Sequence, residues 1–154
     1  MTDIEESRLS QLIRQKIVES YQDIRQMVGT EHIYVFAIGY SHFHGVGSFM
    51  CAANTIENLT DSLLQEPDDI SPELVWSVVE WPYNSAPPSN ELNELVNNLM
   101  ADCEGNINES AEYLLLNEQI ERCLIQSLLE FKKGSFFFSL DLNKLSPILF
   151  VSRD

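Results

Sequence analysis

The chain contains no lysine and no arginine between Arg25 and Arg122. The intervening 96 residues, Gln26 to Glu121, hold 16 of its 24 acidic side chains, where ordinary composition would place about ten basic residues. A surface this anionic repels nucleic acid and anionic membranes and attracts cationic partners. We therefore expect no nucleic-acid partner and no membrane partner, and we expect a basic protein partner.

Targeting features, long apolar runs and a regular cysteine framework are also lacking. The segment Met1–Glu6 is acidic and has no apolar core, unlike a signal peptide, and no run approaches the roughly 18 apolar residues that span a bilayer. The three cysteines are odd in number and far apart, which is typical of reduced thiols. These absences predict a cytoplasmic protein, and 154 residues suit a single domain, 1–154.

Four helices are predicted from capping residues and apolar spacing. Thr2 and Glu5 form a capping box at the start of the first helix, which Gly29 ends in the left-handed conformation; Asn54 and Glu57 form a second box. The second helix stops before Pro67, the third begins near Ser89 or Asn90, and the fourth spans about Ser110 to Lys133.

Strands are predicted where β-branched and aromatic residues gather. These are His32–Tyr40 and Ser48–Ala53 around the turn Ser41–Gly47, then Phe136–Leu142 and Ile148–Ser152, with a further strand in the first half of Leu74–Trp81 and a loop over 82–89. Together the elements predict an α+β domain, with an antiparallel sheet of about four to five strands and helices packed mainly on one face. If the first and last segments pack together, the basic residues share one side of the molecule.

His42, His44 and Cys51 are the residues that could form a metal site. A zinc ion takes three or four converging histidine and cysteine ligands, so one hypothesis is a small metal-binding or enzymatic module at the hairpin. The other is that both histidines are turn residues and that Cys51 packs in the core. The glycines beside the histidines and the apolar neighbours of Cys51 favour the second hypothesis.

The remaining residues do not suggest catalysis. Cys103 lies between Asp102 and Glu104, whose charges raise the pKa of its thiol, and Cys123 falls within a helix as a small apolar residue. The carboxylates lie on hydrophilic helix faces and loops, and no phosphate-binding loop is present. We therefore expect no enzymatic activity and no cofactor.

Three elements resemble a small bacterial family of unknown function associated with toxin–immunity loci. They are the strand Ile33–Ile38, an Ala-Ala-Asn-Thr-x-Glu element at Ala52–Glu57, and a Trp-Ser-x-x-Glu-Trp element at Trp76–Trp81. The resemblance covers roughly Ser10 to Ser152; Val78 departs from the family pattern, which often has proline there. It implies a role as a partner of a toxin, and it implies no catalytic residues.

Charge and resemblance together predict an immunity protein, or antitoxin, that neutralises a cognate basic toxin such as a nuclease through an acidic surface. Trp81 and Tyr83 are candidate anchors of that surface, because tryptophan and tyrosine are common interface hot spots, although the two tryptophans also suit a core. The acidic candidates are Glu66, Asp68, Asp69, Glu73, Glu91, Glu94, Asp102 and Glu104.

Overall fold

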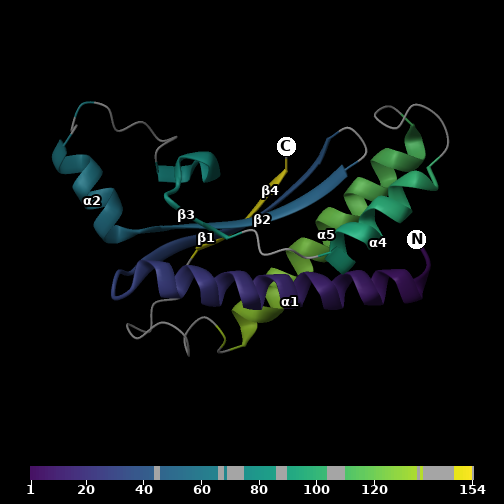
Figure 1. Ribbon diagram of the computed structural model, residues 1–154, viewed down its shortest axis with the longest axis horizontal. Coiled ribbons are helices and arrows are strands. Elements are labelled where there is room, and N and C mark those ends of the chain that lie inside the picture. Colours follow the sequence, from purple (N-terminus) through teal and green to yellow (C-terminus); the bar gives the residue numbers. More distant parts are fainter. Residues whose placement is uncertain are drawn as a thin grey trace.

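A computed structural model of the chain describes residues 1–43, 46–65, 68, 75–85, 90–103, 110–134, 136 and 148–153. Figure 1 shows the order of its elements. These are α1 (Asp3–Val28), β1 (Ile33–Phe43), β2 (Val46–Thr55), α2 (Ile56–Gln65), the 3₁₀ turn η1 (Val78–Glu80), β3 (Tyr83–Ser85), α4 (Asn90–Ala101), α5 (Ala111–Lys133) and β4 (Ile148–Arg153).

The strands form one sheet in the order β3-β2-β1-β4. β1 and β2 are an antiparallel hairpin in which Ile38 pairs with Cys51, and β3 continues the antiparallel pattern along β2. β4 lies parallel to β1, with Val35 opposite Ile148. The α+β class is confirmed, but the prediction of an antiparallel sheet is correct for three strands only, which is fewer than expected.

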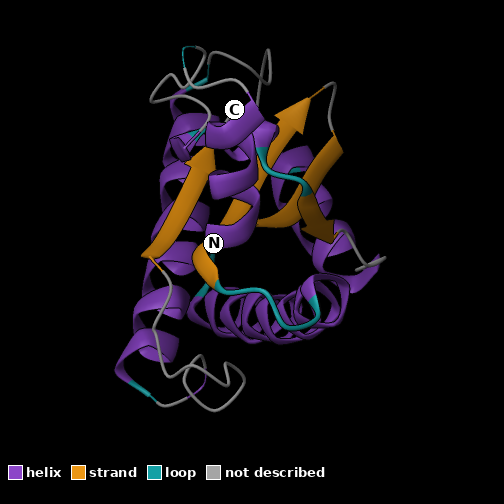
Figure 2. Cartoon of the chain, turned by 90° about the vertical axis from the view of Figure 1, so that its left-hand side faces the viewer, coloured by secondary structure: helices purple, strands orange, loops and turns teal. Residues whose placement is uncertain are grey.

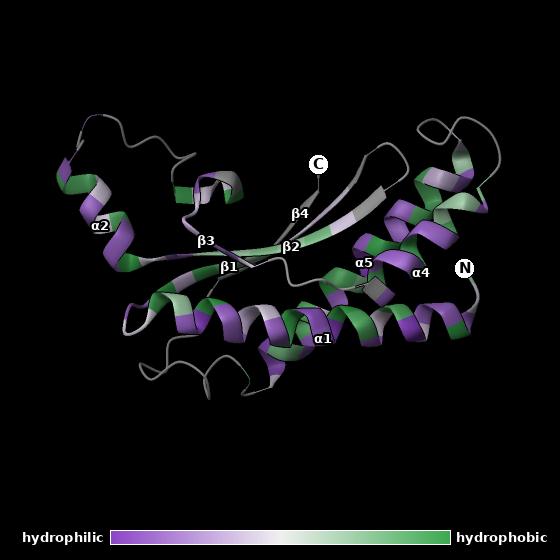
Figure 3. Cartoon of the chain, in the orientation of Figure 1, coloured by the Kyte–Doolittle hydropathy of each residue, from purple (hydrophilic) through white to green (hydrophobic). Residues whose placement is uncertain are grey.

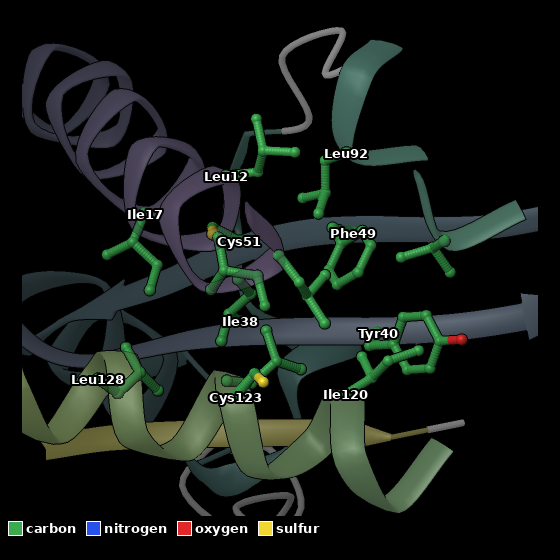
Figure 4. Packing of buried hydrophobic residues seen from close by; sticks show 14 of the residues in the cluster. Leu12, Ile17, Ile38, Tyr40, Phe49, Cys51, Leu92, Ile120, Cys123 and Leu128 are labelled. Atoms are coloured by element: carbon green, nitrogen blue, oxygen red, sulfur yellow. The ribbon is translucent and has the colours of Figure 1, made fainter. Parts of the chain in front are cut away.

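Helices α1, α4 and α5 cover one face of this sheet, as the sequence predicts. When the molecule is turned so that α1 is seen end-on, the strands lie above it and α5 stands upright beside it (Figure 2). Alternate residues of β1 and β2 point into this layer, among them Ile38, Tyr40, Phe49 and Cys51, and they meet apolar side chains from all three helices (Figure 4). Alternation along a strand places these residues on one face of the sheet, and the cluster they form with the three helices is the main core.

The first and last long helices begin where the sequence predicts. Thr2 Oγ1 accepts a hydrogen bond from the Glu5 amide, and the Glu5 carboxylate accepts one from the Thr2 amide, which completes the capping box of α1. Ser110 caps α5 through the Tyr113 amide. Gly29 ends α1 with a φ of 60° and a ψ of −113°, so the positive φ is confirmed although the ψ is not that of a left-handed helix.

The second capping box is wrong by one residue. Asn54 still belongs to β2, and the residue that caps α2 is Thr55, whose Oγ1 accepts the Asn58 amide at 3.1 Å. Glu57 turns away from the helix end and binds the backbone of His32. The cause is competition from other partners, because Asn54 donates to Tyr34 and Glu57 accepts from His32.

The segment between α2 and α4 also differs from the prediction. Residues 75 and 76 are helical and η1 follows, so the part of Leu74–Trp81 that is described is not a strand. The expected loop contains the short strand β3. The predicted strand Phe136–Leu142 lies outside the described residues except for Phe136, which is helical.

The basic residues gather on two helices that pack together. Among the described elements, α1 carries Arg8, Arg14, Lys16 and Arg25, α5 carries Arg122, Lys132 and Lys133, and β4 carries Arg153. α1 and α5 contact each other directly. The first and last long helices therefore pack together, and the charged residues of the elements from α2 to α4 are acidic only.

Candidate partner interface

A polar cluster forms where α1 ends, β1 and α2 begin, and β2 ends. At its centre is the carboxylate of Glu31, which lies in the connection between α1 and β1. Its Oε2 accepts hydrogen bonds from Tyr83 Oη at 2.6 Å and from Thr55 Oγ1 at 2.8 Å. One carboxylate thereby joins the connection after α1 to β2 and β3. Arg25 fixes the same connection from α1, donating to the carbonyl oxygen of Gly29 at 2.7 Å and to that of Glu31.

The hydrogen bond to Glu31 changes the acidity of Tyr83. A hydroxyl that donates to a carboxylate is stabilised in its neutral form, and this bond, together with partial burial and the Glu31 charge, raises the pKa of Tyr83 to about 12. Tyr83 is therefore a fixed donor at neutral pH. It acts as a structural tie rather than as a proton-transfer group.

His32, the residue before β1, and Glu57 of α2 form a second link between these elements. The Glu57 carboxylate accepts the His32 amide at 2.8 Å and also contacts Nδ1 of the imidazole. Partial burial by itself raises the pKa of the Glu57 carboxyl, but the hydrogen bonds and charge of His32 outweigh it and leave that pKa below its ordinary value. The first turn of α2 is thus fastened to β1 by an ionised carboxylate.

Asn54, from the Ala-Ala-Asn-Thr-x-Glu element, is almost completely buried, and its side chain makes three hydrogen bonds. Its Oδ1 accepts the Thr55 amide and the Asn58 side chain, both at 2.9 Å, and its Nδ2 donates to Tyr34 Oη at 3.2 Å. A buried amide with three partners is costly to replace, because each partner would lose its bond. Asn54 therefore sets the angle at which α2 leaves the sheet.

The Trp-Ser-x-x-Glu-Trp element meets this cluster through the carbonyl oxygen of Val75. That oxygen accepts hydrogen bonds from Tyr34 Oη at 3.1 Å and from Trp81 Nε1 at 3.3 Å. The rings of Tyr34 and Trp76 stand edge to face with centroids 6.4 Å apart. The three sequence elements singled out above, which are distant along the chain, therefore converge at one end of the molecule.

Beyond this cluster α2 projects from the molecule with no buried residue (Figure 1). Apolar and polar residues alternate along it in bands (Figure 3). Its apolar side chains remain in contact with solvent: Ile56 is 44% exposed, Leu63 43% and Leu64 77%. Trp76, which the Tyr34 contact holds nearby, is 45% exposed. Amphipathic spacing predicts the helix and its apolar face but does not indicate that the face is exposed.

The acidic candidates that the structure describes do not gather into one surface. Asp68 is exposed shortly after α2, whereas Glu91 and Glu94 lie on α4 and Asp102 follows that helix, at the other end of the molecule (Figure 1). Glu91 is also paired with Arg8. Glu66, Asp69, Glu73 and Glu104 lie outside the described residues.

The two candidate aromatic anchors need correction. Trp81 is only 3% exposed and packs against Val35, Ala37 and Ala52 on the face of the sheet opposite the long helices. Its indole is therefore a core group, and Trp76 is the tryptophan that meets solvent. Tyr83 is partly buried with its hydroxyl bound to Glu31, which leaves little of it for a partner.

The structure separates Cys51 from the rest of the alternative metal site. Cys51 pairs with Ile38, whereas His42 lies four residues further along β1, a separation of roughly 13 Å at strand spacing. Burial also raises the pKa of the Cys51 thiol to about 12, so it does not supply a thiolate. His44 lies outside the described residues. Within the ranges that the structure describes, no group of three or more histidine, cysteine and acidic residues is placed to hold a metal.

A pocket of about 260 Å³ lies at the opposite end, between the start of α1, the end of α4 and the start of α5. Its walls include Leu99 and Leu116, with Asp102, Cys103 and Glu112 beside them. Burial, together with the charges of Glu112 and Asp102, raises the pKa of the Cys103 thiol, as the sequence predicts for its acidic neighbours. A suppressed thiolate makes this pocket a poor place for nucleophilic chemistry.

Comparison with protein families identifies the family to which the chain belongs. The model of a family described as a domain of unknown function, DUF4303, matches residues 13–152. The chain belongs to this family. The matched range contains α2, the polar cluster and both sequence elements that meet there. No curated protein and no solved structure matches the chain. Among the described residues, no helix combines the length and apolar character needed to cross a membrane.

Proposed function

We propose that this member of the family is an immunity protein that acts in the cytoplasm, where it binds and neutralises a cognate basic toxin. The observation that carries the proposal is the separation of charge: no lysine or arginine occurs from Gln26 to Glu121, which includes every described element from β1 to α4. A chain with a net charge of −15 attracts a cationic partner at long range.

Three of the four cations of α1 are paired with a carboxylate or buried. Arg8 is paired with Glu91, and Arg14 with Glu130 at 3.3 Å. Lys16 is buried, and burial lowers the pKa of its ammonium group. The exposed positive side chains on α5, Arg122, Lys132 and Lys133, lie on a different element from the exposed carboxylates of α2 and α4. Helix α2 therefore offers its exposed carboxylates to a partner with no cation on the same helix.

The basic partner that best matches these charges is a toxin that cleaves nucleic acid. Such an enzyme needs a cationic surface to hold phosphates, and an anionic protein competes for that surface. Complementary charge raises the association rate, and ion pairs buried in the contact slow dissociation. Inhibition of this kind requires a shaped surface and needs no catalytic residue on the inhibitor.

The test is association with the product of the gene adjacent to the one that encodes this chain. We expect co-expression to relieve the toxicity of that product, the two proteins to co-purify, and the association rate to fall steeply as salt rises from about 20 to 500 mM. A pair that does not associate, or an association rate indifferent to salt over that range, would contradict the proposal.

A further inference from the structure

Helix α2 is an amphipathic helix whose apolar face is not covered by any element that the structure describes. Ile56, Thr60, Leu63 and Leu64 are spaced at i, i+4, i+7 and i+8 and so share one face, and all four are exposed. A surface helix normally turns such a face toward the core. Ten residues are also too few to form a stable helix alone in water, so something must hold α2 in place.

The polar cluster provides that support from one end. Thr55 caps the first turn, Glu57 is bonded to His32, and Asn58 is bonded to Asn54. All three attachments involve the first turn or the cap. They fix where α2 points and leave the apolar face, further along the helix, uncovered. Trp76 is a further exposed apolar side chain at this end of the molecule, where its ring packs on Tyr34 and Tyr34 is bonded to Asn54.

The charges beside this face determine what can cover it. Glu57 and Asp61 occupy the neighbouring side of α2, and the chain has no lysine or arginine within thirty residues on either side of the helix. In a symmetric dimer the same patch faces itself, so a second copy would set these carboxylates against each other. A partner that covers the face without this repulsion has apolar side chains at its centre and cations at its rim.

We propose that α2 is the docking helix of the protein, and that its face of Ile56, Leu63 and Leu64, together with Trp76, enters an apolar groove rimmed by lysine and arginine on a basic partner. This is recognition of a helix by a groove, with the anchors spaced over two turns. The inference rests on the proposed function for the existence of a basic partner, and it assigns the contact to α2 rather than to the acidic residues of α4.

The experiment measures affinity for the product of the adjacent gene, using the full chain and two matched double variants. Leu63→Gln with Leu64→Gln makes the α2 face polar without changing charge and keeps good helix formers. Ile125→Gln with Leu129→Gln makes the same change at exposed positions of α5. We expect the α2 variant to lose about 30-fold or more in affinity, as for hot-spot residues, and the α5 variant to stay within about 3-fold. Amide exchange in the complex should slow in α2.

The outcomes separate the two proposals. If the wild-type chain binds and the α2 variant binds equally well with unprotected α2 amides, the docking helix is wrong while the proposed function stands. If the wild-type chain does not bind, the proposed function fails and the docking helix with it. If sedimentation shows a wild-type dimer that the α2 variant abolishes, the face belongs to a second copy, which overturns the assignment to a basic partner.

Discussion

The long helices α1 and α5 and the short helix α2 are attached to the rest of the molecule in different ways. α1 and α5 are long and bury apolar side chains along their whole length against the sheet and each other. α2 is short, buries no residue, and is fastened at its first turn by Thr55, Asn54 and the Glu57–His32 pair. Apolar packing makes the first arrangement stable, whereas the second depends on a few directional bonds and leaves a surface exposed.

The difference implies that removal of an apolar side chain lowers the stability of the protein strongly in α1 and hardly at all in α2. Ile17 is fully buried between α1 and the sheet (Figure 4), so Ile17→Ala should lower the free energy of unfolding by about 2–5 kcal/mol. Leu64→Ala removes a side chain that meets solvent, and its effect should stay within about 0.5 kcal/mol. Urea unfolding followed by circular dichroism measures both. A cost for Leu64→Ala similar to that of Ile17→Ala would show that the α2 face is packed.

Loss of a buried polar side chain should have the opposite pattern and affect α2 more than the long helices. Asn54→Ala removes the partner of Tyr34 Oη, the Thr55 amide and the Asn58 side chain together, and should cost about 1–3 kcal/mol. Because these bonds orient α2, its amides should exchange faster while those of α5 do not change. Asn98→Ala, at an exposed position of α4, is the control. Uniformly faster exchange in both helices would mean that Asn54 supports the whole fold and not α2 in particular.

The same contrast explains what the sequence predicts well. The long helices and the hairpin carry strong apolar periodicity and local caps, so α1, α4, α5, β1 and β2 appear close to their predicted positions. The direction of β4 was not predictable, because a short apolar strand has the same pattern beside a parallel or an antiparallel neighbour.

The polar cluster depends on contacts between residues far apart in sequence. The bond from Tyr83 to Glu31 crosses 52 positions, and neither residue has a local pattern that reveals it. The sequence predicts Asn54 and Glu57 as a capping box, because their spacing makes each a plausible partner of the other. The exposure of Leu63 and Leu64 was hidden for a related reason: amphipathic spacing identifies an apolar face without identifying what covers it.

The smallest expected effect concerns the pH dependence of the α2 end. The ordinary pKa of a tyrosine is 10.0 and that of Tyr83 is about 12, so between these values the folded protein keeps a proton that the unfolded chain has lost. The unfolded state then binds fewer protons, and stability falls as pH rises from about 10 to about 12. Tyr83→Phe should make this fall shallower, because the phenyl ring does not titrate. Some decline should remain, since burial also raises the pKa of Tyr34. Urea unfolding at intervals from pH 9 to 12, followed by tryptophan fluorescence, measures the slope, and identical slopes for the two proteins would mean that the Tyr83–Glu31 bond does not hold in solution.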